Sequence, residues 1–154
     1  IGFKSISFDK SLCKEPVKAS DGKISVLLVE PNKYPKMIEI DDTLEAMQVV
    51  VGGDIEEYMP FEDEVAIICN EEGKITGMAP NRAVYEENSR EMLDIICGKF
   101  FVAYAPFEAE RFQSLPPDLA EKYREKFKYP ERIAKVNGEI VAVPFKPVRA
   151  DKER

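Results

Sequence analysis

Residues 23–40, with the sequence KISVLLVEPNKYPKMIEI, form the stretch that decides the fold. The run ISVLLV at 24–29 is apolar and rich in β-branched side chains, which is typical of a buried central strand. Pro31 and Pro35 then bracket a short turn, because proline lacks a backbone N–H group and cannot continue strand pairing. Residues 36–40 mix apolar and polar side chains as a returning strand does, so the segment predicts a β-hairpin.

A short helix is expected directly after this hairpin. Asp42 is a candidate N-cap, and Glu45 lies three residues further on, which together resemble a capping box. Gly52-Gly53 predicts the end of the helix, because glycine adopts the left-handed conformation at low cost. The apolar positions with helical spacing are Leu44, Met47 and Val51. Residues 55–59 and 65–69 are then interpreted as two further strands.

The second half of the chain predicts one more helix and one more hairpin. Ser114 is the expected helix cap, and Tyr129-Pro130 the expected end. Asn137-Gly138 separates two strand-like runs, which is the strongest short hairpin signal in the chain. The expected apolar stripe of the helix consists of Leu115, Leu119, Tyr123 and Phe127. The other expected elements are strands at 74–78, 99–104, 132–136 and 139–143 and a loop at 79–90.

These elements predict an α+β fold with a small mixed or antiparallel sheet, hairpins and two main helices. From residue 23 to residue 74 the order is strand, strand, helix, strand, strand. That order resembles the β-grasp arrangement, in which a helix lies across a mixed sheet. Residues 1–22 are interpreted as an N-terminal extension or edge strand, 23–145 as a single α+β domain, and 146–154 as a charged flexible tail. The first residue is Ile1, which permits a domain cut from a larger protein.

The composition excludes several kinds of chemistry within one chain. The 154 residues contain no histidine, so a Ser-His-Asp triad, a Cys-His pair and a histidine metal ligand are impossible. Neither a G-x-G-x-x-G nor a G-x-x-x-x-G-K-[ST] motif is present. The three cysteines lack paired spacing and are interpreted as buried or reduced thiols. We therefore expect no catalytic residues, no metal and no cofactor, and we expect a cytoplasmic protein with no membrane segment.

Acidic residues are concentrated in the middle of the chain. The formal net charge is −7, but residues 41–121 hold 19 acidic and 5 basic side chains. Such a region repels nucleic acid and attracts a basic protein surface, although a purely solubilising face is the alternative. Direct nucleic-acid binding is further disfavoured because Glu121 and Glu125 interrupt the lysines of the second helix. The candidate partner-binding carboxylates are Glu56, Glu57, Glu62, Asp63 and Glu64.

Four other polar residues stand at predicted strand ends or in the loops that follow them, where binding residues concentrate. They are Glu30, Asn70, Asn81 and Arg82. Arg82 is one of the few cations in the acidic middle, so it either binds an anionic group or neutralises neighbouring carboxylates. A small-molecule-binding protein or enzyme with a pocket around Glu30, Asn81 and Arg82 is the alternative to a protein-binding function.

Several short runs occur in an order that resembles a known family. They are ISVLLVEP at 24–31, VGGDIE at 51–56, ICNEEGK at 68–74, Asn81-Arg82 and IICGKFFV at 95–102. Together they are similar to a domain-of-unknown-function family of small acidic proteins. Its members come from Gram-positive gut bacteria and their conjugative elements, plasmids and phages. No catalytic residues are assigned in that family, so the resemblance supplies none for this chain. We therefore expect a non-catalytic accessory protein of a mobile genetic element, with an anti-defence role as its sharper form.

Overall fold

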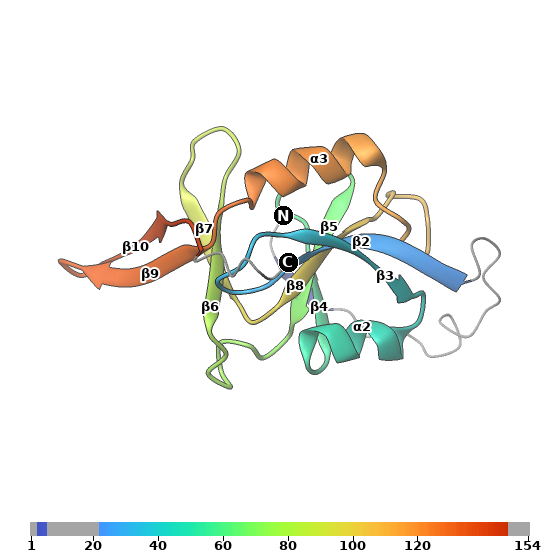
Figure 1. The fold of residues 1–154 in the computed structure, drawn as a ribbon, viewed down its shortest axis with the longest axis horizontal. Coiled ribbons are helices and arrows are strands. Elements are labelled where there is room, and N and C mark those ends of the chain that lie inside the picture. Colours follow the sequence, from blue (N-terminus) through green and yellow to red (C-terminus); the bar gives the residue numbers. More distant parts are fainter. Residues whose placement is uncertain (1–2, 6–21, 148–154) are drawn as a thin grey trace.

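The computed structural model describes residues 3–5 and 22–147 and centres on one six-stranded sheet (Figure 1). Every strand pairing in these residues is antiparallel. In spatial order the strands are β1 (Phe3–Ser5), β4 (Ile55–Tyr58), β5 (Val65–Asn70), β8 (Phe100–Tyr104), β2 (Lys23–Val29) and β3 (Lys36–Asp41). Both edges of this sheet are therefore formed by strands from the first quarter of the chain.

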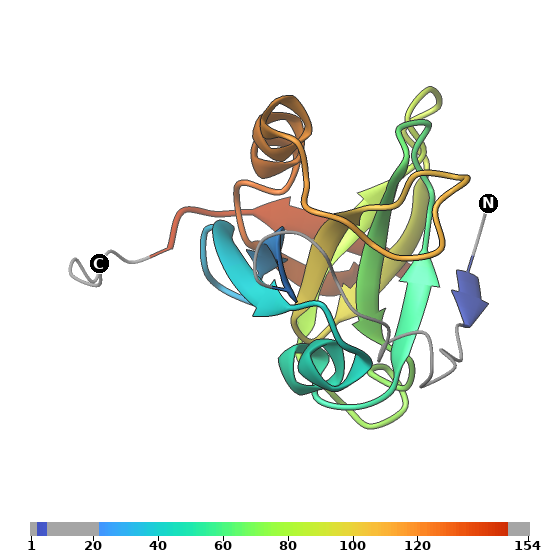
Figure 2. The ribbon, with the colours of Figure 1, turned by 90° about the vertical axis from the view of Figure 1, so that its right-hand side faces the viewer.

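The sheet is covered on both faces, which explains why its central strands are apolar at nearly every position. One face packs against the helix α2 (Leu44–Val51). The other face packs against the helix α3 (Pro117–Lys126) and the two-stranded sheet of β6 (Pro80–Tyr85) and β7 (Met92–Cys97). Figure 2 shows the two helices on opposite sides of the sheet. Successive side chains of a strand alternate between these two cores.

The predicted α+β class is confirmed, and so is the first hairpin. β2 pairs with β3 in a register that places Val26 opposite Ile38. The predicted order of strand, strand, helix, strand, strand is also observed for β2, β3, α2, β4 and β5. The sheet is antiparallel throughout the described residues, however, whereas the β-grasp arrangement has a mixed sheet. The β-grasp resemblance therefore ends at the order of the elements.

The predicted cap of α2 is wrong by one residue. Thr43 is the N-cap, and its side-chain oxygen accepts a hydrogen bond from Ala46 N at 3.1 Å. Asp42 is instead 6% exposed and pairs with Arg111, whose Nη2 lies 3.0 Å from the carboxylate. The predicted end is confirmed, because Gly52 has φ +83° and donates its N–H to Gln48 O. A distant arginine thus decides which of two adjacent capping residues is used.

Three other local predictions are wrong. Residues 74–78 form turns rather than a strand, and residues 80–85 form the buried strand β6 rather than a loop. Ser114 does not cap a helix, since its Oγ accepts a hydrogen bond from Ser25 N at 2.9 Å. α3 begins at Pro117 without a side-chain cap. The turns are closed by local hydrogen bonds such as Thr76 N to Glu72 O, whereas β6 and Ser114 bond to residues far along the chain.

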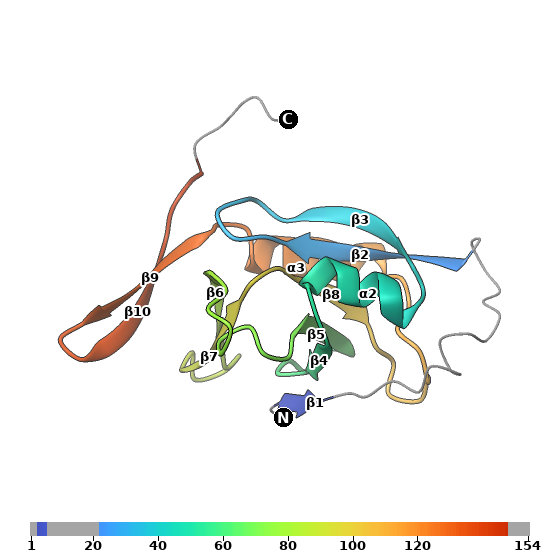
Figure 3. The ribbon, with the colours of Figure 1, turned by 90° about the horizontal axis from the view of Figure 1, so that it is seen from below.

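The last hairpin is confirmed, and it extends away from the sheet as an arm (Figures 1 and 3). It consists of β9 (Glu131–Val136) and β10 (Glu139–Pro144). Asn137 and Gly138 both have positive φ, at +51° and +84°, as a two-residue type I′ turn requires.

The predicted N-terminal extension lies outside the described residues except for β1 and Gly22. The predicted tail lies outside them except for residues 146 and 147. No helix within the described ranges has the length and apolar character needed to cross a bilayer.

Candidate functional site

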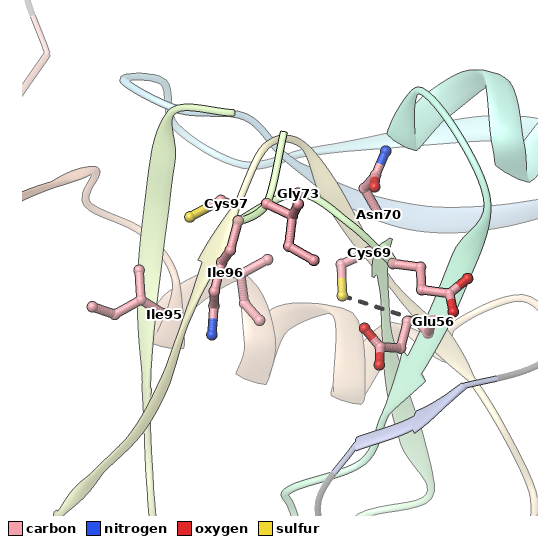
Figure 4. Close-up of a pocket in the computed structure, with 10 residues that line it drawn as sticks. Glu56, Cys69, Asn70, Gly73, Ile95, Ile96 and Cys97 are labelled. Carbon is pink, nitrogen blue, oxygen red and sulfur yellow. Dashed lines mark hydrogen bonds between the residues drawn. The ribbon is translucent and has the colours of Figure 1, made fainter. Parts of the chain in front are cut away.

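A shallow cleft of about 200 Å³ lies between the end of the β4–β5 pair, the turn after β5, and β7 (Figure 4). Glu56 of β4 lies on one side, the last residues of β7 lie on the other, and Cys69 of β5 lies between them. The lining residues are Glu56, Cys69, Asn70, Glu71, Gly73, Lys74, Ile75, Ile95, Ile96 and Cys97. The cleft thus combines an acidic and basic rim with an apolar lining.

The turn that forms one wall of the cleft is held by Asn70 and Gly73. Asn70 donates its amide to Val51 O at 3.1 Å and accepts from Glu72 N at 2.7 Å, so it joins the turn to the end of α2. Gly73 permits close packing, because a Cβ there would lie 2.7 Å from Cys97 O of β7. The predicted site residue Asn70 therefore positions the wall by bonding to backbone.

Carboxylates outnumber basic groups around the cleft, where Glu56, Glu71 and the nearby Asp94 stand against Lys74. Burial raises the pKa of Glu56, and the charges of Glu71 and Asp94 raise it further, while Lys74 opposes them. Lys74 forms an ion pair with Asp94, which lies beside the cleft on β7. Burial is the largest cause of the raised pKa of Glu56, and each of the two neighbouring carboxylates acts on it more strongly than Lys74 does.

The two cysteines at the cleft are poor nucleophiles. Cys69 is 3% exposed, and burial raises the pKa of its thiol to about 12, with a further contribution from Glu56. Its Sγ lies 3.9 Å from Glu56 O. Burial also raises the pKa of the Cys97 thiol. Both sulfurs are therefore protonated near neutral pH, and thiolate chemistry is not favoured here.

The other acidic candidates do not join Glu56 in the cleft. Alternation along β4 places Glu57 on the opposite face of the sheet. Asp63 binds α3, with its carboxylate 2.6 Å from Lys122 Nζ and 2.8 Å from Tyr123 Oη. The Lys122 hydrogen bond lowers the pKa of Asp63.

Glu62 and Glu64 lie in the same β4–β5 loop and act there through their backbones. Glu62 N donates to the Glu87 carboxylate at 3.2 Å, and Glu64 O accepts from Ala105 N at 2.8 Å. The contiguous run 62–64 thus anchors a loop, and it does not extend the acidic rim of the cleft.

The structure brings Glu30, Asn81 and Arg82 together, but Asn81 and Arg82 bond to one another and to backbone, and the Glu30 carboxylate pairs with two lysines. Asn81 Nδ2 donates to Val29 O and Gly98 O, and Asn81 Oδ1 accepts from Arg82 Nη1 at 2.8 Å. The Glu30 carboxylate is 14% exposed and lies between Lys33 and Lys99.

Arg82 is fully buried and links three parts of the fold. Its guanidinium also donates to Phe127 O, Lys33 O and, at 3.4 Å, to Glu30 O. Burial lowers the pKa of Arg82 to about 10, and Glu131 opposes that shift. These donors are directed at carbonyls, which makes Arg82 a structural link between β6, the β2–β3 turn and the end of α3.

Several cleft residues carry no local signal in the sequence. Lys74 and Ile75 fall in a segment expected to be a strand, and Asp94 reaches the cleft only because β7 pairs with β6. Gly73 alone follows a recognisable turn sequence, Asn70-Glu71-Glu72. Among the described residues, no three His, Cys, Asp or Glu side chains are grouped as metal ligands.

Comparison with known proteins places this fold in a family. The model for the Domain of unknown function (DUF3846) matches residues 24–128. The chain belongs to the DUF3846 family. No curated protein and no solved structure matches the chain. The DUF3846 match runs from β2 to just beyond α3 and includes the whole cleft, whereas β1 and the arm lie outside it.

Proposed function

We propose that this DUF3846 protein is a non-catalytic interaction module whose acidic cleft receives a basic side chain of a partner protein. The observation that carries the proposal is geometric: Glu56 and Glu71 line one apolar-lined cleft, and Asp94 lies beside it. Ile75 at the rim is 83% exposed. Lysine and arginine side chains combine an aliphatic stem with a charged head, and therefore suit a cleft with this lining and rim.

The biological setting is part of the proposal. A protein of this kind serves as a cytoplasmic accessory factor of a mobile genetic element in Gram-positive bacteria. In its sharper form it is an anti-defence protein whose acidic cleft competes with nucleic acid for the basic surface of a host effector. Conjugation or phage genes beside the reading frame would support the setting. A restriction or CRISPR interference assay tests the sharper form, which fails when expression of the protein leaves interference unchanged across several systems.

Capture from a host lysate tests the interaction itself. The wild-type chain is immobilised, and retained proteins are compared at about 50 and about 150 mM salt, since ionic attraction weakens as the Debye length shortens. The test variant combines Glu56→Gln with Asp94→Asn. The matched control combines Glu108→Gln with Glu110→Gln, which removes the same charge from the exposed loop before α3.

The proposal expects a partner that the wild type and the control retain and the cleft variant loses. Cross-links from that partner should map to the turn after β5 and to β7. Retention of nothing above background at either salt concentration argues strongly against the proposal. Equal retention by the cleft variant and the control places the binding surface elsewhere.

A further inference from the structure

The β9–β10 arm exposes apolar side chains that no other part of residues 3–5 and 22–147 covers. Val136, Ile140 and Val143 are 49%, 50% and 54% exposed. The main contact of the arm with the body is at its base, where β9 meets β6 and the Glu131 carboxylate accepts from Ala83 N. A two-stranded ribbon is marginally stable in water without further packing. The arm also lies beyond the region matched by the family.

The register of the hairpin sorts the side chains of the arm onto two faces, because paired residues point to the same side. The valine face holds Arg132, Ala134, Val136, Glu139, Val141 and Val143. The opposite face holds Glu131, Ile133, Lys135, Ile140, Ala142 and Pro144. The base of the opposite face turns toward β6 through Glu131, whereas the valine face is exposed at both its base and its tip.

The valine face carries a positive charge near its base and a negative charge at its tip. Arg132 pairs in register with Val143 and stacks on Phe145, whereas Glu139 closes the turn opposite Val136. Four residue steps separate these pairs, which corresponds to about 13 Å along the arm. Arg132 and Glu139 are therefore too far apart to form an ion pair within one arm.

We propose that two copies of this chain associate through their valine faces, with the arms antiparallel about a two-fold axis. Each Val136 then lies opposite the partner's Arg132 and each Glu139 opposite the partner's Val143, so Glu139 and the partner's Arg132 meet diagonally at the same level of the two arms. The Ala134 and Val141 pair lies at the centre and packs on its own copy. One face thus complements itself in charge, as an isologous interface requires.

Strand addition along β10 is a less suitable mode of pairing. Phe145 N donates inward to Pro130 O, so alternation along the strand turns the nitrogen of Pro144 outward. Proline has no N–H group, and at an edge it interrupts pairing with another strand. The contact we propose is therefore between faces.

The expected association is weak because the face is small. Two six-residue strands present an area of roughly 20 Å by 10 Å, well below the roughly 800 Å² per partner of a standard interface. We expect a dissociation constant on the order of 10 to 1,000 μM, which a concentration series in sedimentation velocity or multi-angle scattering can detect.

Charge reversal tests the proposed contact on the full chain. Arg132→Glu and Glu139→Lys each place like charges beside one another, and each variant alone should be monomeric at concentrations where the wild type dimerises. An equimolar mixture of the two variants should restore the dimer. In the mixed dimer one ion pair joins the native Glu139 of one chain to the native Arg132 of the other, and the second ion pair joins the two substituted positions with the signs of their charges exchanged. Lys135→Glu is the matched control on the opposite face and should dimerise as the wild type does.

Restoration by mixing distinguishes contact between copies from damage to the arm, which mixing cannot repair. Far-ultraviolet circular dichroism checks that each variant keeps the fold. The proposal is overturned when the wild type stays monomeric up to about 1 mM, when single reversals leave the dimer intact, when the mixture stays monomeric, or when Lys135→Glu acts as Arg132→Glu does. None of these results depends on the acidic cleft.

Discussion

Replacing Arg82 with methionine should destabilise the protein by about 3 to 5 kcal/mol. The guanidinium donates to four acceptors, of which Phe127 O and Asn81 Oδ1 are buried. The other two, Glu30 O and Lys33 O, are only partly buried, so water can replace their lost partner. Each of the two buried acceptors that is left without a donor costs about 1 to 3 kcal/mol of unfolding free energy. Burial of the charged guanidinium is itself unfavourable and lowers its pKa to about 10. The methionine variant does not bury this charge, and that gain offsets part of the lost hydrogen bonding, so the net cost stays near the range given above.

Urea unfolding followed by circular dichroism measures this cost as a shift in the midpoint at constant slope. Arg124→Met is the control, because Arg124 lies on the exposed side of α3 and should change stability by less than about 0.5 kcal/mol. Arg82→Lys should fall between the two, since an ammonium group cannot reproduce the planar fork. A cost below about 1 kcal/mol for Arg82→Met would show that the carbonyl contacts do not stabilise the fold, and would reopen a ligand-binding role for Arg82.

Three further changes test other parts of the structure. Thr43→Ala should cost about 1 kcal/mol of unfolding free energy through loss of the α2 cap, and Thr43→Ser should restore most of it. Gly73→Ala should cost about 1 to 3 kcal/mol, because the added methyl group meets the Cys97 carbonyl, and a cost near zero would show that the turn can move away from β7. Asp63 has a lowered pKa in the fold, so its stabilising contribution is present above its ordinary value of 3.8 and is lost as the pH falls through the folded value. In the Asp63→Asn variant the free energy of unfolding should therefore fall less steeply as the pH is lowered. If the slope against pH is the same as in the wild type, the Asp63–Lys122 bond is not the source of the acid sensitivity.

The sequence predicts those elements whose cause is local. The run 24–29 and the run 65–69 are apolar because their strands are buried on both faces, and that pattern is visible without partners. Asn137-Gly138 adopts the two positive φ angles that its turn needs, so these two residues alone predict the last hairpin. The Gly52 ending of α2 has the same local origin.

The elements that escaped prediction depend on partners far along the chain. β6 holds Asn81 and Arg82 at fully buried positions, so its sequence has the polarity of a loop. Their hydrogen-bond partners include Val29, Phe127 and Lys33, between 45 and 52 residues away. No local pattern encodes those acceptors. The candidate cleft has the same origin, because its two sides meet only when the β6–β7 sheet packs across β5.

The acidic middle of the chain does not act as one surface. Asp42, Asp63 and Asp94 each pair with a lysine or arginine of another element, and these pairs hold Arg111, α3 and the turn after β5 in place.

The two pairs with exposed lysines, Asp63–Lys122 and Asp94–Lys74, contribute only about 0 to 1 kcal/mol each. A main consequence of all three pairs is to neutralise carboxylates that a simple charge count treats as free. Glu56 differs because burial, together with the charges of Glu71 and Asp94, raises its pKa. The position of a carboxylate therefore matters more for partner binding than the net charge of the region. A variant that neutralises Glu56 should weaken salt-sensitive binding more than one that neutralises two exposed loop glutamates.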